Sequence, residues 1–348
     1  MYKRTRTHRH MLLLAGGLLA MLMIVTACGS SGPDEAAEAP AKVTFMAGFK
    51  PQANLPFVAA YVAWEKGYFA EQGLEVDILH SNAGQHLQLL LAGDVDITTA
   101  DAPSVLKRRA APDVPIRAIA LFGQSGQTAF AVLESSGMRS PKDWEGKTFG
   151  YKGSQPAEYL ALLNAAGVDR SKIQEVRVGF DPRVLSEGQV DILAVFRSNE
   201  PDTLARIGHP VRIFRPDDFG VPTMGLTYIA TTETIAENSD VVERFLKATM
   251  RAFAFTLENE EETLDIVMTF APQEDREHQR FMLREELRNA QGPVTLADGL
   301  GAMTGEQWRA LYDQLLEFEA LTRSFDYRTA YDDQFMRAIY EGPKLQWP

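Results

Sequence analysis

Side chains that could catalyse a reaction or hold a metal are scattered along this sequence and form no motif. The histidines beyond the first ten residues show no HExxH or comparable ligand spacing (His80, His86, His209 and His278). The chain has no G-x-S-x-G nucleophile turn, no G-x-G-x-x-G loop and no Walker loop. Its one cysteine, Cys28, excludes an intramolecular disulfide and any zinc or iron–sulfur site built from several cysteines. The sequence therefore predicts no enzyme, no metal site and no cofactor.

Amide, hydroxyl and aromatic side chains recur instead in loops next to strand-like segments, where they can point into a binding cleft. Asn54 contacts a ligand or caps the helix that follows it, and Asp101 has the same two alternatives. The candidate ligand-binding residues are Gln52, Asn54, Phe57, Asn82, Gln85, Asp101, Gln124, Tyr151, Ser154, Gln155, Phe196, Asn199 and Met224.

Strand-like and helical segments alternate along most of the chain, which favours an α/β fold with helices covering mixed sheets. Residues 43–49 predict a strand and residues 57–68 a helix, and the alternation continues through a second unit that begins near residue 140. The final ninety residues are mostly helical in pattern. The smaller unit is therefore expected to be inserted into the larger one, with lobe 1 over residues 43–130 and 228–348 and lobe 2 over residues 131–227.

Composition limits the partners of this chain. It has 348 residues, 45% of them hydrophobic, and a formal charge of −12 at pH 7. The first 27 residues hold four basic residues and no acidic one, so the remainder carries 31 Lys and Arg against 47 Asp and Glu, or −16. Such a surface repels nucleic acid, and the hydrophobic content excludes a disordered or fibrous chain.

The N-terminus predicts export and lipid anchoring. Residues 1–10 are basic and polar, and residues 11–25 form an apolar run shorter than a membrane-spanning helix, so residues 1–27 are expected to be a signal peptide. Val25-Thr26-Ala27-Cys28 resembles the lipobox of bacterial lipoproteins, in which the cysteine is lipidated. Residues 28–42 are small and polar and predict a flexible tether. An ordinary buried cysteine is the alternative, but a short core helix would not follow such a basic segment.

Four segments resemble the solute-binding subunits of bacterial ABC importers, in particular the nitrate, sulfonate, taurine and thiamine-pyrimidine group. They are residues 59–78 (AAYVAWEKGYFAEQGLEVDI), 91–97 (LAGDVDI), 140–150 (SPKDWEGKTFG) and 187–192 (EGQVDI). This resemblance implies a two-lobed periplasmic-binding-protein fold, type II-like, with the ligand cleft between the lobes. It also implies a monomer on the extracytoplasmic face that closes on a small solute and delivers it to a membrane permease driven by an ATPase.

The resemblance and the cleft candidates together favour a neutral, planar heteroaromatic solute. The candidates are mainly amides, hydroxyls and aromatic rings, and none of Arg108, Arg109, Arg183 and Arg197 lies clearly at a loop tip. Riboflavin is favoured because several rings could enclose a tricyclic system (Phe49, Phe57, Phe122, Tyr151 and Phe196). The alternatives are the formylaminopyrimidine precursor of thiamine, or an alkanesulfonate, taurine or nitrate anion. A distant alternative is the fungal pyrimidine-synthesising branch, whose cysteine-rich motif is absent here.

Overall fold

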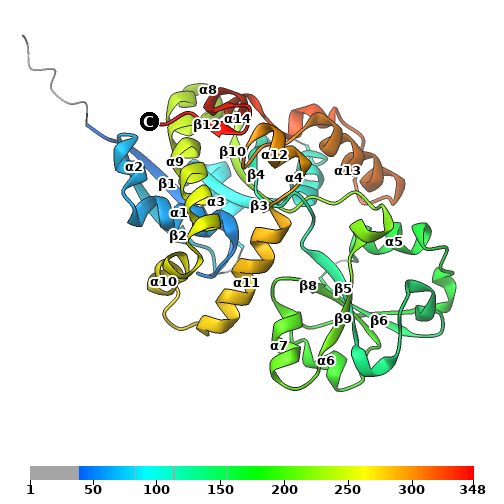
Figure 1. Ribbon diagram of the computed structural model, residues 1–348. Coiled ribbons are helices and arrows are strands. Elements are labelled where there is room, and N and C mark those ends of the chain that lie inside the picture. The colour runs from blue at the N-terminus through cyan, green and yellow to red at the C-terminus, as the bar shows by residue number, and fades with distance from the viewer. Residues whose placement is uncertain (1–38, 83, 113, 154) are drawn as a thin grey trace, which may run out of the picture. The chain divides into compact units, whose positions relative to one another are not determined.

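The computed structural model describes residues 39–348 apart from 83, 113 and 154 (Figure 1). The predicted signal peptide, Cys28 and most of the predicted tether lie outside the described residues, as does Ser154. Two five-stranded mixed sheets, each covered by helices, form the two lobes, and this confirms the predicted α/β class. No helix among these described residues is both long enough and apolar enough to cross a membrane.

The sheet of lobe 1 has the strand order β2-β1-β3-β10-β4. Strands β1, β2 and β3 are parallel, whereas β10 runs antiparallel to both of its neighbours, β3 and β4. The strands are β1 (Ala41–Ala47), β2 (Leu74–His80), β3 (Ile97–Asp101), β4 (Ile116–Leu121) and β10 (Leu226–Thr231). Because parallel strands point the same way, the loops after β1, β2 and β3 meet at one edge of the sheet, where ligands bind in open α/β sheets.

Among the described residues, fourteen helices, helical turns and short strands complete lobe 1. They are α1 (Leu55–Glu65), α2 (Tyr68–Glu71), α3 (His86–Ala92), α4 (Ala102–Arg109), α8 (Thr232–Glu237), α9 (Ser239–Glu258), α10 (Glu260–Phe270), α11 (Arg276–Asn289), α12 (Pro293–Asp298), α13 (Gly305–Glu317), η5 (Tyr327–Ala330), α14 (Gln334–Ile339), β11 (Tyr340–Glu341) and β12 (Lys344–Leu345). The C-terminal part is thus helical, as predicted, except for the small β11–β12 hairpin.

Helix α1 is the central helix of lobe 1. Residues 55–63 are all buried, because α1 lies between the sheet and α9. Aromatic side chains fill the space beside it: Phe45 meets Tyr228 edge to face at 5.3 Å, and Phe69 stacks on Phe245 at 5.2 Å. This packing fixes where α1 begins, and with it the loop between β1 and α1.

The sheet of lobe 2 repeats the same pattern with the order β7-β6-β8-β5-β9. Strands β6, β7 and β8 are parallel, and β5 runs antiparallel to β8 and β9. Phe130, Trp144, Phe149 and Tyr159 form its core, with Phe149 stacked on Tyr159 at 3.9 Å. The elements are β5 (Thr128–Leu133), η1 (Glu134–Ser136), η2 (Pro141–Trp144), β6 (Thr148–Lys152), α5 (Ala157–Ala165), η3 (Arg170–Lys172), β7 (Gln174–Val178), α6 (Arg183–Ser186), β8 (Ile192–Phe196), α7 (Glu200–Arg206), β9 (Val211–Phe214) and η4 (Pro216–Phe219).

The two segments that join the lobes touch each other at a pair of glycines. Gly225 donates its backbone N–H to the carbonyl of Gly123 at 2.8 Å. A Cβ atom on Gly123 would lie 2.7 Å from Gly225 Cα, so no side chain fits there. The predicted lobe boundaries at 130/131 and 227/228 fall inside β5 and β10. Their apolar sequences predict strands but cannot say at which residue the chain passes from one sheet to the other.

Candidate functional site

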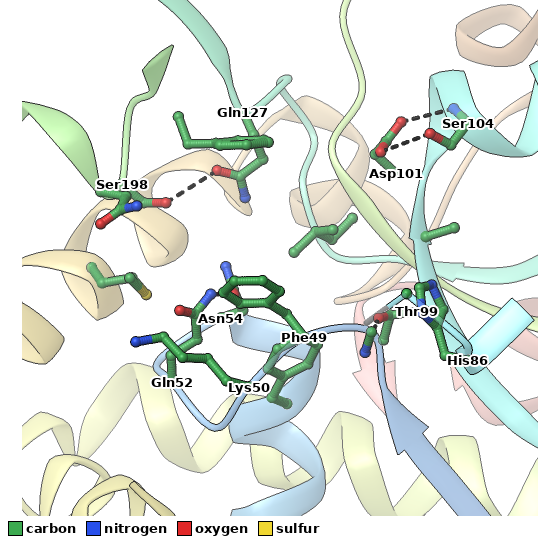
Figure 2. Close-up of a pocket in the computed structure, with 18 of the residues that line it drawn as sticks. Phe49, Lys50, Gln52, Asn54, His86, Thr99, Asp101, Ser104, Gln127 and Ser198 are labelled. Carbon is green, nitrogen blue, oxygen red and sulfur yellow. Dashed lines mark hydrogen bonds between the residues drawn. The ribbon is translucent and has the colours of Figure 1, made fainter. Parts of the chain in front are cut away.

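A cavity of about 790 Å³ lies between the lobes. Lobe 1 contributes the loops after β1 and β2, the start of α3, the end of β3, and parts of α4 and α11, while lobe 2 contributes the segments that follow β7 and β8. Figure 2 shows Lys50, Gln52 and Asn54 on the first of these loops, with Gln127 and Ser198 across from them. The cavity has the size and position typical of a small-molecule site.

Three phenylalanine rings line this cavity and remain exposed. Phe49 and Phe196 are each 51% exposed, and Phe180 is 80% exposed. Phe49 belongs to lobe 1, whereas Phe180 and Phe196 belong to lobe 2. Exposed phenyl rings on both sides of one cavity can stack on an aromatic ligand. Phe57, the ring predicted from the first lobe, also borders the cavity but is only 2% exposed, because it packs in the lobe 1 core.

Amide side chains form one polar end of the cavity. Asn54 occupies the N-cap position of α1 but makes no side-chain cap; its amide nitrogen donates to Glu286 Oε1 at 3.2 Å. Its amide oxygen accepts from Gln52 Nε2. Gln127 donates through Nε2 to the same Glu286 Oε1 at 2.7 Å. The side chain of Asn54 therefore does not cap α1, which was one of its two predicted roles.

A second polar end is built where β3 meets α4. Asp101 borders the cavity and caps α4, since its carboxylate accepts from Ser104 N at 2.7 Å and from Ser104 Oγ at 2.9 Å. Gly48 N donates to Thr99 Oγ1 at 3.0 Å, and a Cβ on Gly48 would lie 2.7 Å from that oxygen. The backbone of the β1 loop can approach β3 this closely only because residue 48 is glycine.

His86 and Arg108 lie at this same end. Burial, and then the charge of Arg108, lower the pKa of His86. Arg108 borders the cavity and forms no ion pair with any residue that the structure describes. The cavity lysine is different, since Lys50 Nζ lies 2.5 Å from Glu274 Oε1. The protein thus already neutralises the charge of Lys50.

Six of the thirteen predicted ligand contacts line the cavity: Gln52, Asn54, Phe57, Asp101, Phe196 and Asn199. Asn82 is exposed in the loop between β2 and α3. Gln85, at the start of α3, accepts a hydrogen bond from Ser81 Oγ at 3.0 Å. Gln124 donates to the carbonyl of Ala302 at 2.9 Å, at the crossing between the lobes.

Three further predicted contacts that the structure describes also lie off the cavity lining: Tyr151, Gln155 and Met224. Tyr151 stacks on Phe149 at 6.0 Å, at the edge of the lobe 2 core. Gln155 donates to Glu175 at 2.7 Å, and Met224 is buried in a lobe 1 cluster. These residues were predicted because they lie near the end of a strand. That position does not separate cavity residues from core residues, because successive side chains of a strand point to opposite faces of the sheet.

Sequence reasoning missed the contribution of the helical tail. Glu274, His278, Gln279 and Met282, just before and within α11, all line the cavity. His278 and Met282 are four residues apart and so share one helical face. That spacing was visible in the sequence, but nothing in it indicated that α11 faces the cleft. Phe180, two residues after β7, was also missed although it satisfies the same loop rule that selected Phe196.

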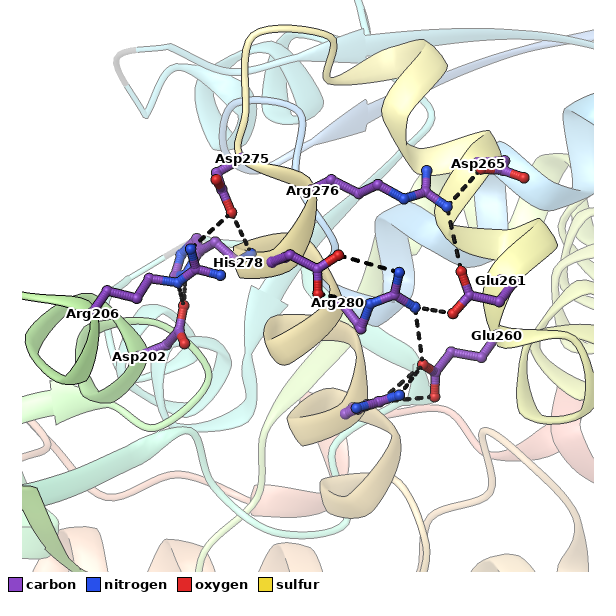
Figure 3. A network of polar contacts seen from close by, with 11 residues as sticks. Asp202, Arg206, Glu260, Glu261, Asp265, Asp275, Arg276, His278 and Arg280 are labelled. Atoms are coloured by element: carbon purple, nitrogen blue, oxygen red, sulfur yellow. Dashed lines mark hydrogen bonds and ion pairs between the residues drawn. The ribbon is translucent and has the colours of Figure 1, made fainter. Parts of the chain in front are cut away.

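Contacts between the lobes surround one side of the cavity. His278 of lobe 1 contacts Asp202 of lobe 2 through Nδ1 at 2.7 Å, and Arg206 NH1 lies 3.2 Å from Asp275. Figure 3 shows these residues facing one another between α7 and the start of α11, while Arg276 turns toward α10. Arg276 pairs with Asp265 of α10 at 2.7 Å. Helix α11 is therefore tied to its own lobe while it reaches the other.

The described side chains of this site do not form a metal-binding group. Across residues 39–348, leaving out the three undescribed positions, no group of three or more His, Cys, Asp and Glu side chains is arranged to hold an ion. What the cavity offers is rings, amides, hydroxyls and mostly paired charges. This arrangement can bind and orient a small molecule.

The two mixed, helix-covered sheets and the cavity between them define a two-lobed solute-binding protein. The chain belongs to the NMT1/THI5-like family, whose model matches residues 54–263. It is 29% identical over 311 residues to a formylaminopyrimidine-binding protein of Halalkalibacterium halodurans (86% of this chain, 91% of the relative). It is 28% identical over 341 residues to the riboflavin-binding protein RibY of Chloroflexus aurantiacus (91% and 96%). These matches confirm the family resemblance inferred from the sequence.

The chain is also similar to a protein named as a synthase and, in fold, to a sulphonate-binding protein. The chain is 26% identical over 250 residues to a 4-amino-5-hydroxymethyl-2-methylpyrimidine phosphate synthase, THI5, of Saccharomyces cerevisiae (67% and 72%). Among solved structures, the sulphonate-binding protein SsuA of Escherichia coli matches with a TM-score of 0.65 at 16% identity, covering 89% of this chain and 95% of that one. This structural likeness confirms the periplasmic-binding-protein fold.

Proposed function

We propose that this protein is the lipid-anchored solute-binding subunit of an ABC importer and that riboflavin is its solute. In this proposal Cys28 carries the lipid, the lobes close on the solute, and the closed monomer delivers it to a permease driven by an ATPase. The names of the bacterial relatives support this class, since both are binding proteins. The solute leaves the cavity chemically unchanged.

The observation that carries the choice of solute is the pair of half-exposed rings Phe49 and Phe196. They come from different lobes and line the same cavity. A flat tricyclic ligand can stack on both when the lobes close, and each offset stack contributes about 0.5–1.5 kcal/mol beyond the area it buries. The amides at one end and the hydroxyl and carboxylate groups at the other suit a ligand with ring N–H and carbonyl groups and a polyhydroxyl tail.

Charge pairing at the cavity argues against an anionic solute. Lys50 is paired with Glu274, and the cavity residue Glu200 is paired with Lys152 behind it. A sulfonate or nitrate would have to compete with these carboxylates, leaving Arg108 as the cavity cation without an ion pair among the described residues. A neutral heteroaromatic needs no such competition.

The formylaminopyrimidine precursor of thiamine is the second candidate. It is favoured by the 29% identity to a protein named for binding it, which extends over 86% of this chain. A single pyrimidine ring could use the same phenylalanines, although it would leave more of the roughly 790 Å³ cavity unfilled. Size and the second polar end favour riboflavin.

Flavin fluorescence gives a direct test with the purified full-length protein in detergent. Titration with riboflavin is expected to quench the emission saturably and to raise the melting temperature, because a ligand selective for the folded state stabilises it. Mass spectrometry of the released flavin should show an unchanged mass. If flavin emission is untouched while the formylaminopyrimidine raises the melting temperature, riboflavin is the wrong solute. Repeated turnover of either compound would contradict the binding role.

A further inference from the structure

Glu286 is a buried carboxylate beneath the cavity that contacts residues from both lobes. It lies on α11 and is 3% exposed. Its Oε1 accepts from Gln127 Nε2 at 2.7 Å and from Asn54 Nδ2 at 3.2 Å, and its Oε2 accepts from the backbone N–H of Leu55 at 3.5 Å. Ser198 of lobe 2, whose hydroxyl donates to Gln127 Oε1 at 3.4 Å, also lowers the pKa of this carboxyl group. Glu286 is therefore shared by several groups that border the cavity.

The surroundings of Glu286 present hydrogen-bond donors to both of its oxygens. Burial raises the pKa of Glu286, and its neighbours Gln127, Ser198, Leu55 and Asn54 oppose that shift. A backbone N–H can only donate, so the oxygen facing Leu55 must accept. The other oxygen, Oε1, accepts from the NH₂ groups of Asn54 and Gln127, so both carboxyl oxygens act as acceptors in this arrangement.

An acceptor-only partner fixes which way the neighbouring amides point. A side-chain amide has a donating NH₂ end and an accepting oxygen end, and only the NH₂ end can bond to a carboxylate oxygen. The amide oxygens of Asn54 and Gln127 are thereby turned away from Glu286. Asn54 Oδ1 accepts from Gln52 and Gln127 Oε1 accepts from Ser198 Oγ at 3.4 Å, and an amide oxygen can accept a second bond.

We propose, on the basis of the proposed function, that Glu286 is a positioning residue that sets the donor–acceptor selectivity of the cavity. Glu286 holds Asn54 and Gln127 with their amide oxygens turned away from its own carboxylate. This end of the cavity then selects heteroaromatic ligands that donate a ring N–H. A ligand that offers only acceptors here places them against those amide oxygens with no hydrogen bond between them, which is costly once the cavity is closed to water. Glu286 itself acts through the two amides.

Riboflavin and riboflavin methylated on its imide nitrogen form the matched pair of probes, because the methyl group removes the one ring N–H. Binding is measured by fluorescence titration of full-length wild type, Glu286→Gln and Glu285→Gln. Glu285 is the adjacent residue on α11, is also buried, and pairs with Arg288 instead. The control thus removes the same charge from the same helix without touching the amides.

Wild type and Glu285→Gln are expected to prefer riboflavin by about tenfold to a hundredfold, the usual effect of one unpaired buried group. In Glu286→Gln the new amide can donate as well as accept, so Asn54 and Gln127 lose their fixed orientation and the preference should fall below about threefold. A structural role alone would weaken both flavins equally and leave the ratio unchanged.

Three results separate the possible failures. Equal binding of both flavins by wild type, or a wild-type preference retained in Glu286→Gln, overturns this inference while riboflavin binding stands. If wild type binds neither flavin, the proposed function is wrong and the inference fails with it. Should Glu286→Gln not fold, Gln127→Ala removes one positioned amide and must lower the preference at least about threefold; an unchanged preference overturns the inference.

Discussion

His278 Nδ1 lies 2.7 Å from Asp202 Oδ2, and the two residues belong to different lobes. The other ring nitrogen of His278 lies 3.0 Å from Asn199 Oδ1, also in lobe 2. His278 and Asn199 border the cavity, so this contact between the lobes is made at the edge of the binding site. Arg206 and Asp275 add an ion pair at 3.2 Å beside it (Figure 3). Closure and solute retention are therefore expected to depend on the same few side chains.

Asp202→Asn should speed release of the bound solute. It removes the charge that Nδ1 of His278 faces, and because this contact joins the two lobes, separating them should cost less free energy. Dissociation is expected to become about threefold to tenfold faster in stopped-flow fluorescence. Asp313→Asn, at an exposed pair with Arg309, is the matched control. Equal release rates for the two variants would show that the His278 contact does not hold the lobes closed.

Phe49→Ala and Phe196→Ala should each weaken flavin binding by about tenfold, through lost stacking and lost apolar burial. Both rings are half exposed in the cavity, so the folded protein itself loses little packing. Fluorescence titration measures the effect. Leu296→Ala removes an exposed apolar side chain outside the cavity lining and should leave affinity unchanged. Wild-type affinity in both phenylalanine variants would rule out a ring stacked between the lobes.

Gly225→Ala should lower the free energy of unfolding by about 1–3 kcal/mol. The new Cβ would lie 2.9 Å from Gly123 Cα and from the Ser125 carbonyl oxygen, so the two crossing segments must separate. Urea unfolding measures the loss. Gly179→Ala is the control, because nothing lies within 4 Å of a Cβ placed there. Equal stabilities would mean that the crossing segments are not tightly packed.

His86 should make the stability of the protein decrease in mild acid. Burial and Arg108 lower its pKa in the folded state below the ordinary value of 6.5, so the unfolded chain takes up a proton that the folded one resists. This contribution is present above about pH 6.5 and is lost as the pH falls from there to the folded pKa. His86→Gln should flatten that part of a melting-temperature profile, while the exposed His209→Gln controls for the substitution. A profile unchanged by His86→Gln would contradict the assignment.

Cys28→Ser should release the protein from membranes into the soluble fraction of the producing cell without unfolding the domain. The expectation rests on the lipobox-like sequence before Cys28 and on the proposal that a lipid is the anchor. Fractionation followed by detection of the protein measures the effect, and a fluorescence titration checks that the released domain still binds. Unchanged retention in the membrane fraction would mean that another attachment exists.

Local patterns predicted much of the fold. The alternating segments around residues 43–49 and 57–68 correspond to β1 and α1, and the helical pattern of the tail corresponds to α9 through α14. Such patterns work because burial of one face of a strand or helix leaves a period of two or 3.6 residues in the sequence. They do not say which sheet a strand joins, and for this reason the boundaries at 130/131 and 227/228 fall inside β5 and β10.

The sequence by itself determined the α/β class, the family, the loop that holds Gln52 and Asn54, and the strand ends at Asp101 and Phe196. Only the tertiary structure decided that Tyr151 packs against the lobe 2 core, that Phe57 is buried, and that α11 brings His278 and Glu286 to the cleft. The reason is physical: secondary structure depends on neighbours three or four positions away, whereas a binding site depends on where distant segments pack. Asn54 and Glu286 are 232 residues apart in the chain and 3.2 Å apart in space.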